Sequence, residues 1–238
     1  MHKKILLGFT TTPGSNWREK IKDIDKYGIK EMAFFPTFLK MRDRKEIYGL
    51  LEKTGLEEIP HVHLRDDMEN WEMEYYLERY KTKVFNIHTK KIDYSYLERF
   101  PHLAQQFFVE NPDTLSEEFF ELSERYGGVC FDVSHFYDFG VLQEEASYKD
   151  FLGYLQKKKV GCCHISAISK KNRKDFWGNK NYSNHFLKNS SEVDYVDKYV
   201  EYLPDIISIE LENSFEQQIK IKERLEKIIN KMSTENIK

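Results

Sequence analysis

Histidines and carboxylates in this sequence gather at the ends of short apolar runs. The run Val129-Cys130-Phe131 ends in Asp132, and His135 follows shortly after it. Comparable positions hold the rest of the set: His61, His63, His88, Glu110, His164, His185, Glu210 and Glu212. Neutral imidazoles and carboxylates form a common ligand mixture for zinc or manganese, so the pattern predicts a site for divalent metal ions.

The elements that must position these residues follow a regular alternation. Apolar runs typical of strands cover residues 4–10, 31–37, 59–64, 83–89, 105–111, 128–134, 160–166 and 205–213. Amphipathic, charge-rich stretches between them favour helices, as in residues 16–28, 116–128, 192–203 and 214–232, with the weakest helix signal at 92–102. Gly28 is a C-cap candidate and Ser116 an N-cap candidate.

Eight successive strand-then-helix units in 238 residues predict an α/β fold, a closed (β/α)8 TIM barrel. The main rival is an open doubly wound sheet, which usually carries a glycine-rich phosphate loop after its first strand. The first turn here is TTTPGSNW, which lacks that loop. Even composition predicts a single domain over residues 1–232, with a frayed tail at 233–238.

Strand parity predicts where the polar side chains point, since successive residues face opposite sides of a strand. If Val109, Phe131, Cys163 and Ile209 face the helices, then Glu110, Asp132, His164 and Glu210 point into the barrel mouth. Burying several carboxylates together without cations is costly, and divalent ions remove that cost. His63 and Glu212 share parity with a candidate two residues earlier, and we interpret them as supporting residues.

Composition limits the function classes. The formal net charge of -3 gives no general attraction to nucleic acid but does not exclude it, and no apolar stretch approaches the length of a membrane span. The three cysteines lie in apolar runs without C-x-x-C spacing, which predicts buried reduced thiols in a cytoplasmic protein. We expect a monomer without membrane contact.

Five segments in order resemble the xylose isomerase-like TIM barrels, the superfamily of endonuclease IV and of many sugar isomerases and epimerases. GVCFDVSH is similar to the endonuclease IV stretch G-V-C-[IL]-D-T-C-H. IPHVHL, FNIHT, VENP and CHIS resemble further segments of that family at the third, fourth, fifth and seventh strands. The resemblance covers nearly the whole chain in strand order and implies the same barrel.

The resemblance also implies roles for the matching residues. Glu110, Asp132, His164 and Glu210 would form a metal site shared by both branches of the superfamily, and Glu110 and Glu210 would be the catalytic carboxylates. His61, His88 and Glu110 would hold a second metal in the endonuclease branch. His135 and His185 would belong to a third metal, whose remaining ligand in that family is an Asp where this chain has Ser183.

Three functions remain open at this point. The first is metal-dependent hydrolysis of a phosphate ester or phosphodiester, of the endonuclease IV type, with zinc as the expected metal. The second is isomerisation or epimerisation of a sugar or sugar phosphate, with one manganese, cobalt or magnesium ion and a Glu110–Glu210 pair that moves a proton. The third is a catalytically degenerate, ligand-binding member, suggested by Ser183.

Basic loops favour a phosphate-bearing partner, either DNA or a sugar phosphate. Residues 167–190 hold six basic residues against one acidic residue, a net of +5. Residues 36–46 hold four against two, a net of +2, which leaves about -10 for the rest of the chain. The expected substrate-binding residues are Lys170, Lys171, Arg173, Lys174 and Trp177, the last as a stacking surface.

Overall fold

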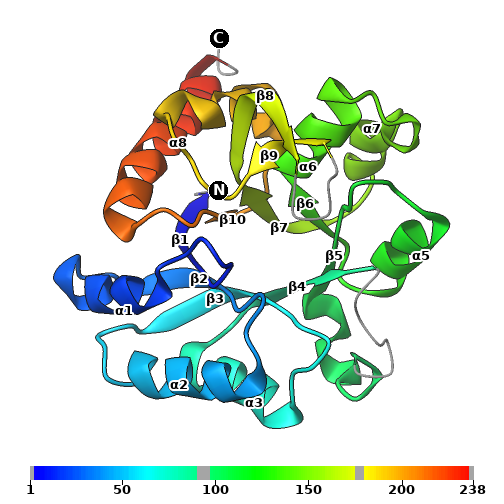
Figure 1. The fold of residues 1–238 in the computed structure, drawn as a ribbon. Coiled ribbons are helices and arrows are strands. Elements are labelled where there is room, and N and C mark those ends of the chain that lie inside the picture. The colour runs from blue at the N-terminus through cyan, green and yellow to red at the C-terminus, as the bar shows by residue number, and fades with distance from the viewer. Residues whose placement is uncertain (1–2, 90–96, 175–179, 236–238) are drawn as a thin grey trace.

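A computed structural model describes residues 3–89, 97–174 and 180–235. Eight parallel strands close into a barrel in the order β1-β10-β7-β6-β5-β4-β3-β2. They are β1 (Lys4–Thr10), β2 (Glu31–Phe35), β3 (Glu58–His63), β4 (Val84–His88), β5 (Phe107–Glu110), β6 (Val129–Asp132), β7 (Val160–Ile165) and β10 (Ile206–Ile209). All eight expected strands are therefore confirmed, and helices cover the outside of the ring (Figure 1).

Alternate residues of each strand face two different apolar regions, as parity requires. Val109, Phe131, Cys163 and Ile209 pack in the large cluster between the strands and the helices. Phe108, Cys130 and Cys162 pack with Val84 in a small separate cluster inside the barrel. The polar residues that share parity with this inner cluster therefore face the barrel interior.

The longer helices lie where the amphipathic pattern predicts them. They are α1 (Trp17–Lys26), α2 (Met41–Leu51), α3 (Asn70–Tyr80), α5 (Glu117–Arg125), α7 (Phe151–Leu155) and α8 (Phe215–Glu235). Ser116 caps α5 by accepting a hydrogen bond from the Phe119 amide, and Gly28 follows α1 with a φ of +61°. Both cap predictions are confirmed. α8 continues past the domain end expected at residue 232.

The segment expected as an α-helix at 192–203 is a 3-10 helix, η4 (Ser190–Tyr202). Its buried residues are Val193, Tyr195, Val196, Tyr199 and Val200. The segment is therefore amphipathic, as expected, but in the tighter helical form. A second 3-10 helix, η1 (Pro101–Gln106), precedes β5, and the weak helix signal at 92–102 lies partly outside the described residues.

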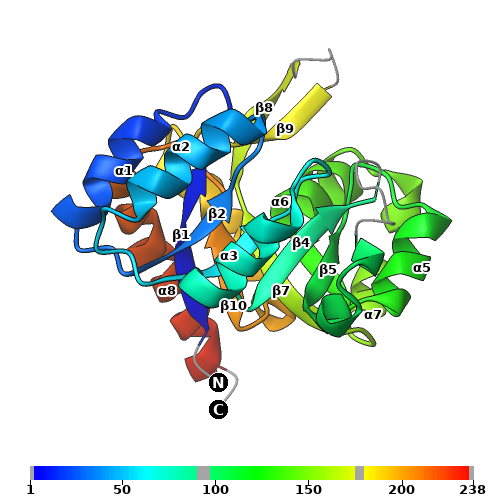
Figure 2. The ribbon, with the colours of Figure 1, turned by 90° about the horizontal axis from the view of Figure 1, so that it is seen from below.

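The loop after β7 forms an antiparallel hairpin of β8 (Ala167–Lys174) and β9 (Lys180–Asn184), which the sequence reading did not anticipate. After β6 the chain makes a short turn, α6 (Val133–His135), followed by the π-helix η2 (Phe136–Leu142) and the 3-10 turn η3 (Ala146–Tyr148). Figure 2 shows the hairpin projecting from one end of the barrel, while β1 starts and α8 ends at the other. The hairpin therefore stands at the carboxyl ends of the strands.

None of the helices within residues 3–89, 97–174 and 180–235 combines the length and apolar character that a membrane crossing requires. Cys130, Cys162 and Cys163 are buried free thiols, as expected.

Candidate metal centre

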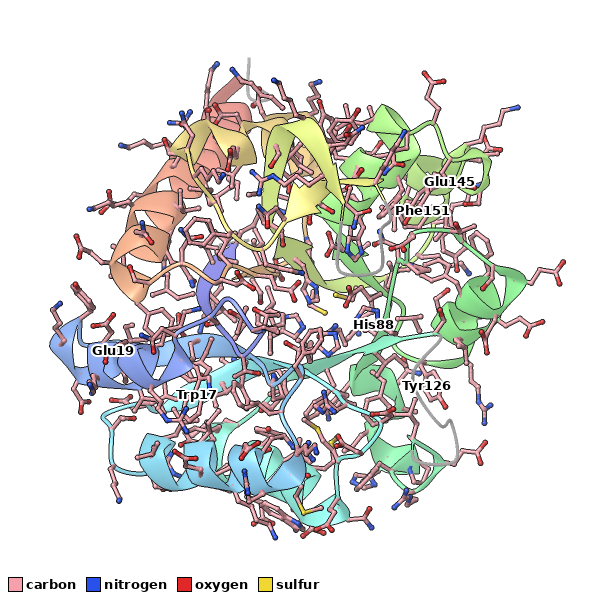
Figure 3. The ribbon with its side chains drawn as sticks, viewed as in Figure 1. Trp17, Glu19, His88, Tyr126, Glu145 and Phe151 are labelled. Atoms are coloured by element: carbon pink, nitrogen blue, oxygen red, sulfur yellow. The ribbon has the colours of Figure 1, made fainter. Side chains whose placement is uncertain are left out.

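Titratable side chains from six strands meet at the carboxyl end of the barrel. His63, His88, Glu110 and Asp132 are the last residues of β3, β4, β5 and β6. His164 is the penultimate residue of β7, and Glu210 directly follows β10. Because the strands are parallel, these ends share one face of the barrel. In Figure 3, His88 lies within the ring of ribbons, whereas Glu19 and Glu145 lie at its periphery.

The His164 imidazole lies among three carboxylates. Its Nδ1 atom is 3.2 Å from Glu210 Oε2, 3.5 Å from Glu110 Oε2 and 3.7 Å from Asp132 Oδ2. All four side chains are at most 7% exposed, so water does not screen the charges. The ligand atoms of Asp132, His164 and Glu210 all lie within 4.8 Å of one another.

Two atoms of this group are buried without hydrogen bonds. They are Asp132 Oδ2 and His164 Nδ1. Buried polar atoms are nearly always satisfied, so such a pair needs a physical explanation. A carboxylate oxygen and an imidazole nitrogen facing the same point are the donors that zinc and similar divalent ions take. The donor set therefore fits a divalent metal ion.

A second group lies beside the first and contains His63 rather than His61. His63 Nε2 is 2.8 Å from His88 Nε2, and these two atoms are 3.6 and 3.7 Å from Glu110 Oε2. His63 Nδ1 bonds the Leu64 carbonyl at 2.8 Å, which fixes the proton there and leaves Nε2 as the electron-pair donor. Burial lowers the pKa of His63 to about 3, so the ring is neutral near pH 7.

His61 lies deeper in the barrel, so our expectation that it meets His88 and Glu110 is corrected. Its ring nitrogens bond Ser208 Oγ at 2.7 Å and Asn86 Oδ1 at 3.0 Å. His61 and His63 share parity and both face the interior, but His63 is two residues nearer the mouth. The Asn86 amide links the layers, since its Nδ2 donates to Glu110 Oε2 at 2.5 Å.

His135 is held next to Glu110 and Asp132 by the turn after β6. Asp132 Oδ1 accepts a hydrogen bond from the His135 amide at 2.8 Å, so this carboxylate caps the turn while its other oxygen stays available. His135 Nδ1 lies 3.7 Å from Asp132 Oδ2 and 3.9 Å from Glu110 Oε1. Asp132 therefore caps the turn with one oxygen and is a candidate metal ligand through the other.

His185 stands at the rim and faces Glu210. Its Nδ1 is 3.9 Å from Glu210 Oε1 and 3.3 Å from the Glu210 carbonyl, and its side chain is 39% exposed. Ser183, where the resemblance expects an Asp ligand, donates its amide to Asp138 Oδ2 at 2.7 Å. Within the described part of the chain, no group of three converging ligand atoms includes His185.

Burial and neighbouring charges shift the pKa values of the buried carboxylates in opposite directions. Burial, reinforced by Glu210 and Asp132, raises the pKa of Glu110 to about 8, although His164 opposes the shift. Burial also disfavours the charge of Glu210, but His185 and His164 outweigh it and lower the pKa of Glu210 to about 2. His135 and His164 likewise hold the pKa of Asp132 below its usual range despite burial.

The pKa values of the two imidazoles among these carboxylates are both raised. Burial alone would lower the pKa of His135, but Asp132 and Glu110 raise it to about 9. Glu110 and Glu210 likewise raise the pKa of the buried His164 well above its usual value. Without a cation, protons on these imidazoles therefore balance the negative charge, and a divalent ion would replace them.

Basic side chains line the hairpin above this site. Lys170, Lys171 and Arg173 on β8 are exposed, as is Lys180 on β9. The side chain of Lys174 and the whole of Trp177 lie outside the described residues. Arg44, counted in the basic loop 36–46, is instead fully buried and pairs with Glu72 and Asp67, so it does not belong to the rim.

Several supporting residues escaped the sequence reading. Asn86, Asn111, Asp138 and Ser208 all bond the groups described above or their neighbours. Asn111 Oδ1 accepts from the Asp132 amide at 2.8 Å and so fixes the end of β6. Parity could have revealed Asn86 and Ser208, which share a face with His88 and Glu210 on their strands.

No family model and no curated protein matches the sequence. Among solved structures, the chain is similar to a xylose isomerase domain protein from Planctomyces limnophilus, with 12% identity, a TM-score of 0.51, and coverage of 96% of this chain and 98% of the other. It is also similar to a truncated 3-deoxy-D-arabino-heptulosonate 7-phosphate synthase from Thermotoga maritima, with 10% identity, a TM-score of 0.50, and coverage of 97% and 88%.

These similarities concern the fold. They agree with the closed parallel barrel and with the resemblance inferred from the five sequence segments. The chain therefore has a closed (β/α)8 TIM-barrel fold, with a cluster of histidines and carboxylates at the carboxyl ends of its strands.

Proposed function

We propose that the protein is a metal-dependent hydrolase of phosphate esters or phosphodiesters, with endonuclease IV as its nearest model. The observation that carries this proposal is the shared carboxylate Glu110. Its Oε2 faces His63 and His88 on one side and His164 on the other, at 3.5 to 3.7 Å. A carboxylate shared by two groups of candidate ligands can hold two adjacent divalent ions, the arrangement used in two-metal hydrolytic sites.

Each group of residues has a defined part in such a reaction. Glu110, His63 and His88 would hold one ion, and Asp132, His164 and Glu210 a second, and this mixture of three imidazoles and three carboxylates suits zinc. When bound, divalent ions supply positive charge that stabilises a phosphoryl group under attack and activates a water nucleophile. His135 lies next to both groups, where it can orient a phosphate oxygen or hold a proton.

The exposed lysines and arginine of β8 and β9 would guide and orient the substrate. The hairpin stands over the carboxyl ends of the strands, so its positive charge acts at the mouth of the site. Phosphate contacts of this kind position a ligand without reading its sequence. The partner we propose is therefore a phosphate-bearing substrate, either DNA or a sugar phosphate.

A second candidate is a sugar or sugar-phosphate isomerase or epimerase. A cavity of about 250 Å³ adjoins His63 and His88 and is lined also by Thr37, Phe38, Leu64, Arg65 and Asp66. That volume suits a single small molecule. Glu110 and Glu210 both face His164 Nδ1, at 3.5 and 3.2 Å, and their separated pKa values suit one acid and one base.

Metal content and activity together test the proposal. Protein purified without chelators should contain two zinc ions at this centre and should cleave abasic-site DNA or a simple phosphate diester. Glu110→Gln should abolish that activity, whereas Glu121→Gln, on the exposed side of α5, should not. If the protein instead contained one manganese, cobalt or magnesium ion and converted a ketose phosphate, the proposal of a hydrolase would be replaced by that of an isomerase. Bound metal without turnover of either substrate class would indicate a ligand-binding member.

A further inference from the structure

Beneath the carboxylates, the barrel interior contains a layer of thiols and imidazoles. Cys130, Cys162 and His61 are all fully buried there, and His164 reaches the layer from above. The interior of such barrels is normally filled by bulky branched apolar side chains. Four sulfur and nitrogen donors in this place therefore need a chemical explanation.

The donors are close enough to share one ion. Cys130 Sγ lies 3.5 Å from His164 Nε2, and the ligand atoms of His61, Cys130 and His164 lie within 4.8 Å of one another. Cys162 is the register partner of Cys130 across β6 and β7, and the two thiols pack in the same small buried cluster. The layer thus offers two thiols and two imidazoles.

We propose that this layer is a second metal site, distinct from the carboxylate centre, which binds Zn²⁺ or a similar thiophilic divalent ion through Cys130, Cys162, His61 and His164. Two cysteines and two histidines are a common tetrahedral donor set for zinc. Binding forms two metal–thiolate and two metal–imidazole bonds, and it releases to solvent the two thiol protons and the proton on the coordinating nitrogen of His164. The filled site carries no net charge, which a dry interior tolerates.

The neighbours of His61 are compatible with binding. Asn86 Oδ1 accepts from one ring nitrogen, as the outer partner of a ligating histidine usually does. The other nitrogen meets the Ser208 hydroxyl, a group that rotates away from an incoming ion at little cost. His61 can therefore change from a hydrogen-bonded core residue to a ligand without moving its backbone.

His164 connects this layer to the carboxylate centre. Its Nε2 faces Cys130, and its Nδ1 faces Glu210 at 3.2 Å. Simultaneous loading of both layers makes this imidazole a bridge and removes its ring proton. The thiol layer itself does not depend on the proposed hydrolysis, because Cys130, Cys162 and His61 lie outside the carboxylate centre.

Cobalt titration of the metal-free protein tests the site, because thiolate ligands give Co²⁺ an intense near-ultraviolet charge-transfer band that carboxylates and imidazoles do not. The wild type should develop this band, and excess Zn²⁺ should remove it. Cys130→Ser should lose it, whereas Cys163→Ser should keep it, because Cys163, next to Cys162 on β7, faces the helices. Asp132→Asn, which alters only the carboxylate centre, should also keep the band.

Two results would overturn the proposal: Co²⁺ bound by the wild type without the band, or an equal band in Cys130→Ser. X-ray absorption of the zinc-loaded wild type gives an independent reading, in case the serine variant folds poorly. Zinc–sulfur distances of about 2.3 Å are expected, and a spectrum with only nitrogen and oxygen ligands would contradict the site. Loss of hydrolysis with the band intact would count against the proposed function alone.

Discussion

Asp132 Oδ2 and His164 Nδ1 lie 3.7 Å apart inside the barrel, and neither atom makes a hydrogen bond. The two residues are directly paired in the register of β6 and β7, so the backbone fixes their separation. A site held this way is preorganised, and little of the binding energy of an ion is lost in ordering its ligands.

Metal binding should therefore raise stability strongly. At a Zn²⁺ concentration 100 times the dissociation constant, the expected gain in the free energy of unfolding is about 2.7 kcal/mol. Chelation should reverse it. Asp132→Asn removes an anionic ligand but keeps the shape, so its thermal midpoint should respond less to Zn²⁺ than that of the wild type, through the ligand groups that remain. Differential scanning calorimetry with and without the ion checks this, and an equal shift in both proteins would contradict the role of Asp132.

The two histidines of β3 should differ in their effect on the mouth of the barrel. His63→Gln should weaken zinc binding at the group with His88 and Glu110 by at least about tenfold, because it removes a donor facing both. His61→Gln should leave binding at that group unchanged. The imidazole NMR signal of His88 during zinc titration reports this group directly. If His61→Gln changed the His88 titration and His63→Gln did not, our assignment would be reversed.

Asp138 should hold the β8–β9 hairpin in place without affecting metal binding. Its carboxylate is buried and accepts from the Tyr182 and Ser183 amides at 2.8 and 2.7 Å. Asp138→Ala should speed hydrogen exchange at these two amides by tenfold or more and weaken substrate binding, while metal content stays constant. Asp150→Ala is a suitable control, since Asp150 caps no helix through its side chain. Unchanged amide protection in Asp138→Ala would show that the hairpin is held by other contacts.

Lys20 should make stability depend on pH above neutrality. Its ammonium group is buried against the Leu211 carbonyl at 2.8 Å, and burial lowers the pKa of Lys20 to about 7, although Glu212 opposes the shift. Between about pH 7 and 10.5 the unfolded chain keeps a proton that the folded chain has lost, so this residue makes the free energy of unfolding rise with pH.

The contribution of Lys20 should approach about 1.4 kcal/mol per pH unit within that window. Lys20→Met should remove it, while Lys22→Met, on the exposed side of the same helix, should not. Urea unfolding at about pH 7.5 and 9.5 measures the difference between each variant and the wild type. Parallel pH profiles for Lys20→Met and the wild type would contradict the buried charge.

Phe38 should matter for the ligand more than for the fold. It is 60% exposed, has a φ of +63° and borders the cavity beside His63 and His88. The left-handed backbone costs a non-glycine residue about 1–2 kcal/mol, roughly offset by the entropy that glycine loses on folding. Phe38→Gly should therefore leave the free energy of unfolding within about 1 kcal/mol of wild type but raise KM. A large loss of stability with unchanged KM would contradict this role.

Much of the barrel could be predicted because strand parity is a local property. The inward set that includes Cys130 and Cys162 and the outward set that includes Phe131 and Cys163 follow from alternation alone. The position of a side chain along the barrel axis cannot be predicted in this way, because it depends on how neighbouring strands are staggered. Parity could not separate His61 from His63, and only the register of β3 against β4 places His63 beside Asn86 and His88 at the mouth.

The β8–β9 hairpin and the 3-10 form of η4 could not be predicted from the sequence, for two different reasons. Half of residues 167–174, AISKKNRK, are charged and the segment shows no apolar alternation, so nothing local distinguishes strand β8 from a solvated loop. In η4, a period of three is hard to tell from 3.6 over so few turns. Tertiary contacts decide both, through Asp138 for the hairpin and the buried valines for the helix.

The hairpin enters and leaves the barrel at nearly one point, because Ala167 pairs with Asn184 at its base. Because its two ends adjoin, this segment can be shortened, lengthened or replaced while β7 and η4 keep their positions. Substitutions confined to this hairpin could therefore change which ligands enter the mouth of the barrel, while the strands that carry the candidate metal ligands stay unchanged.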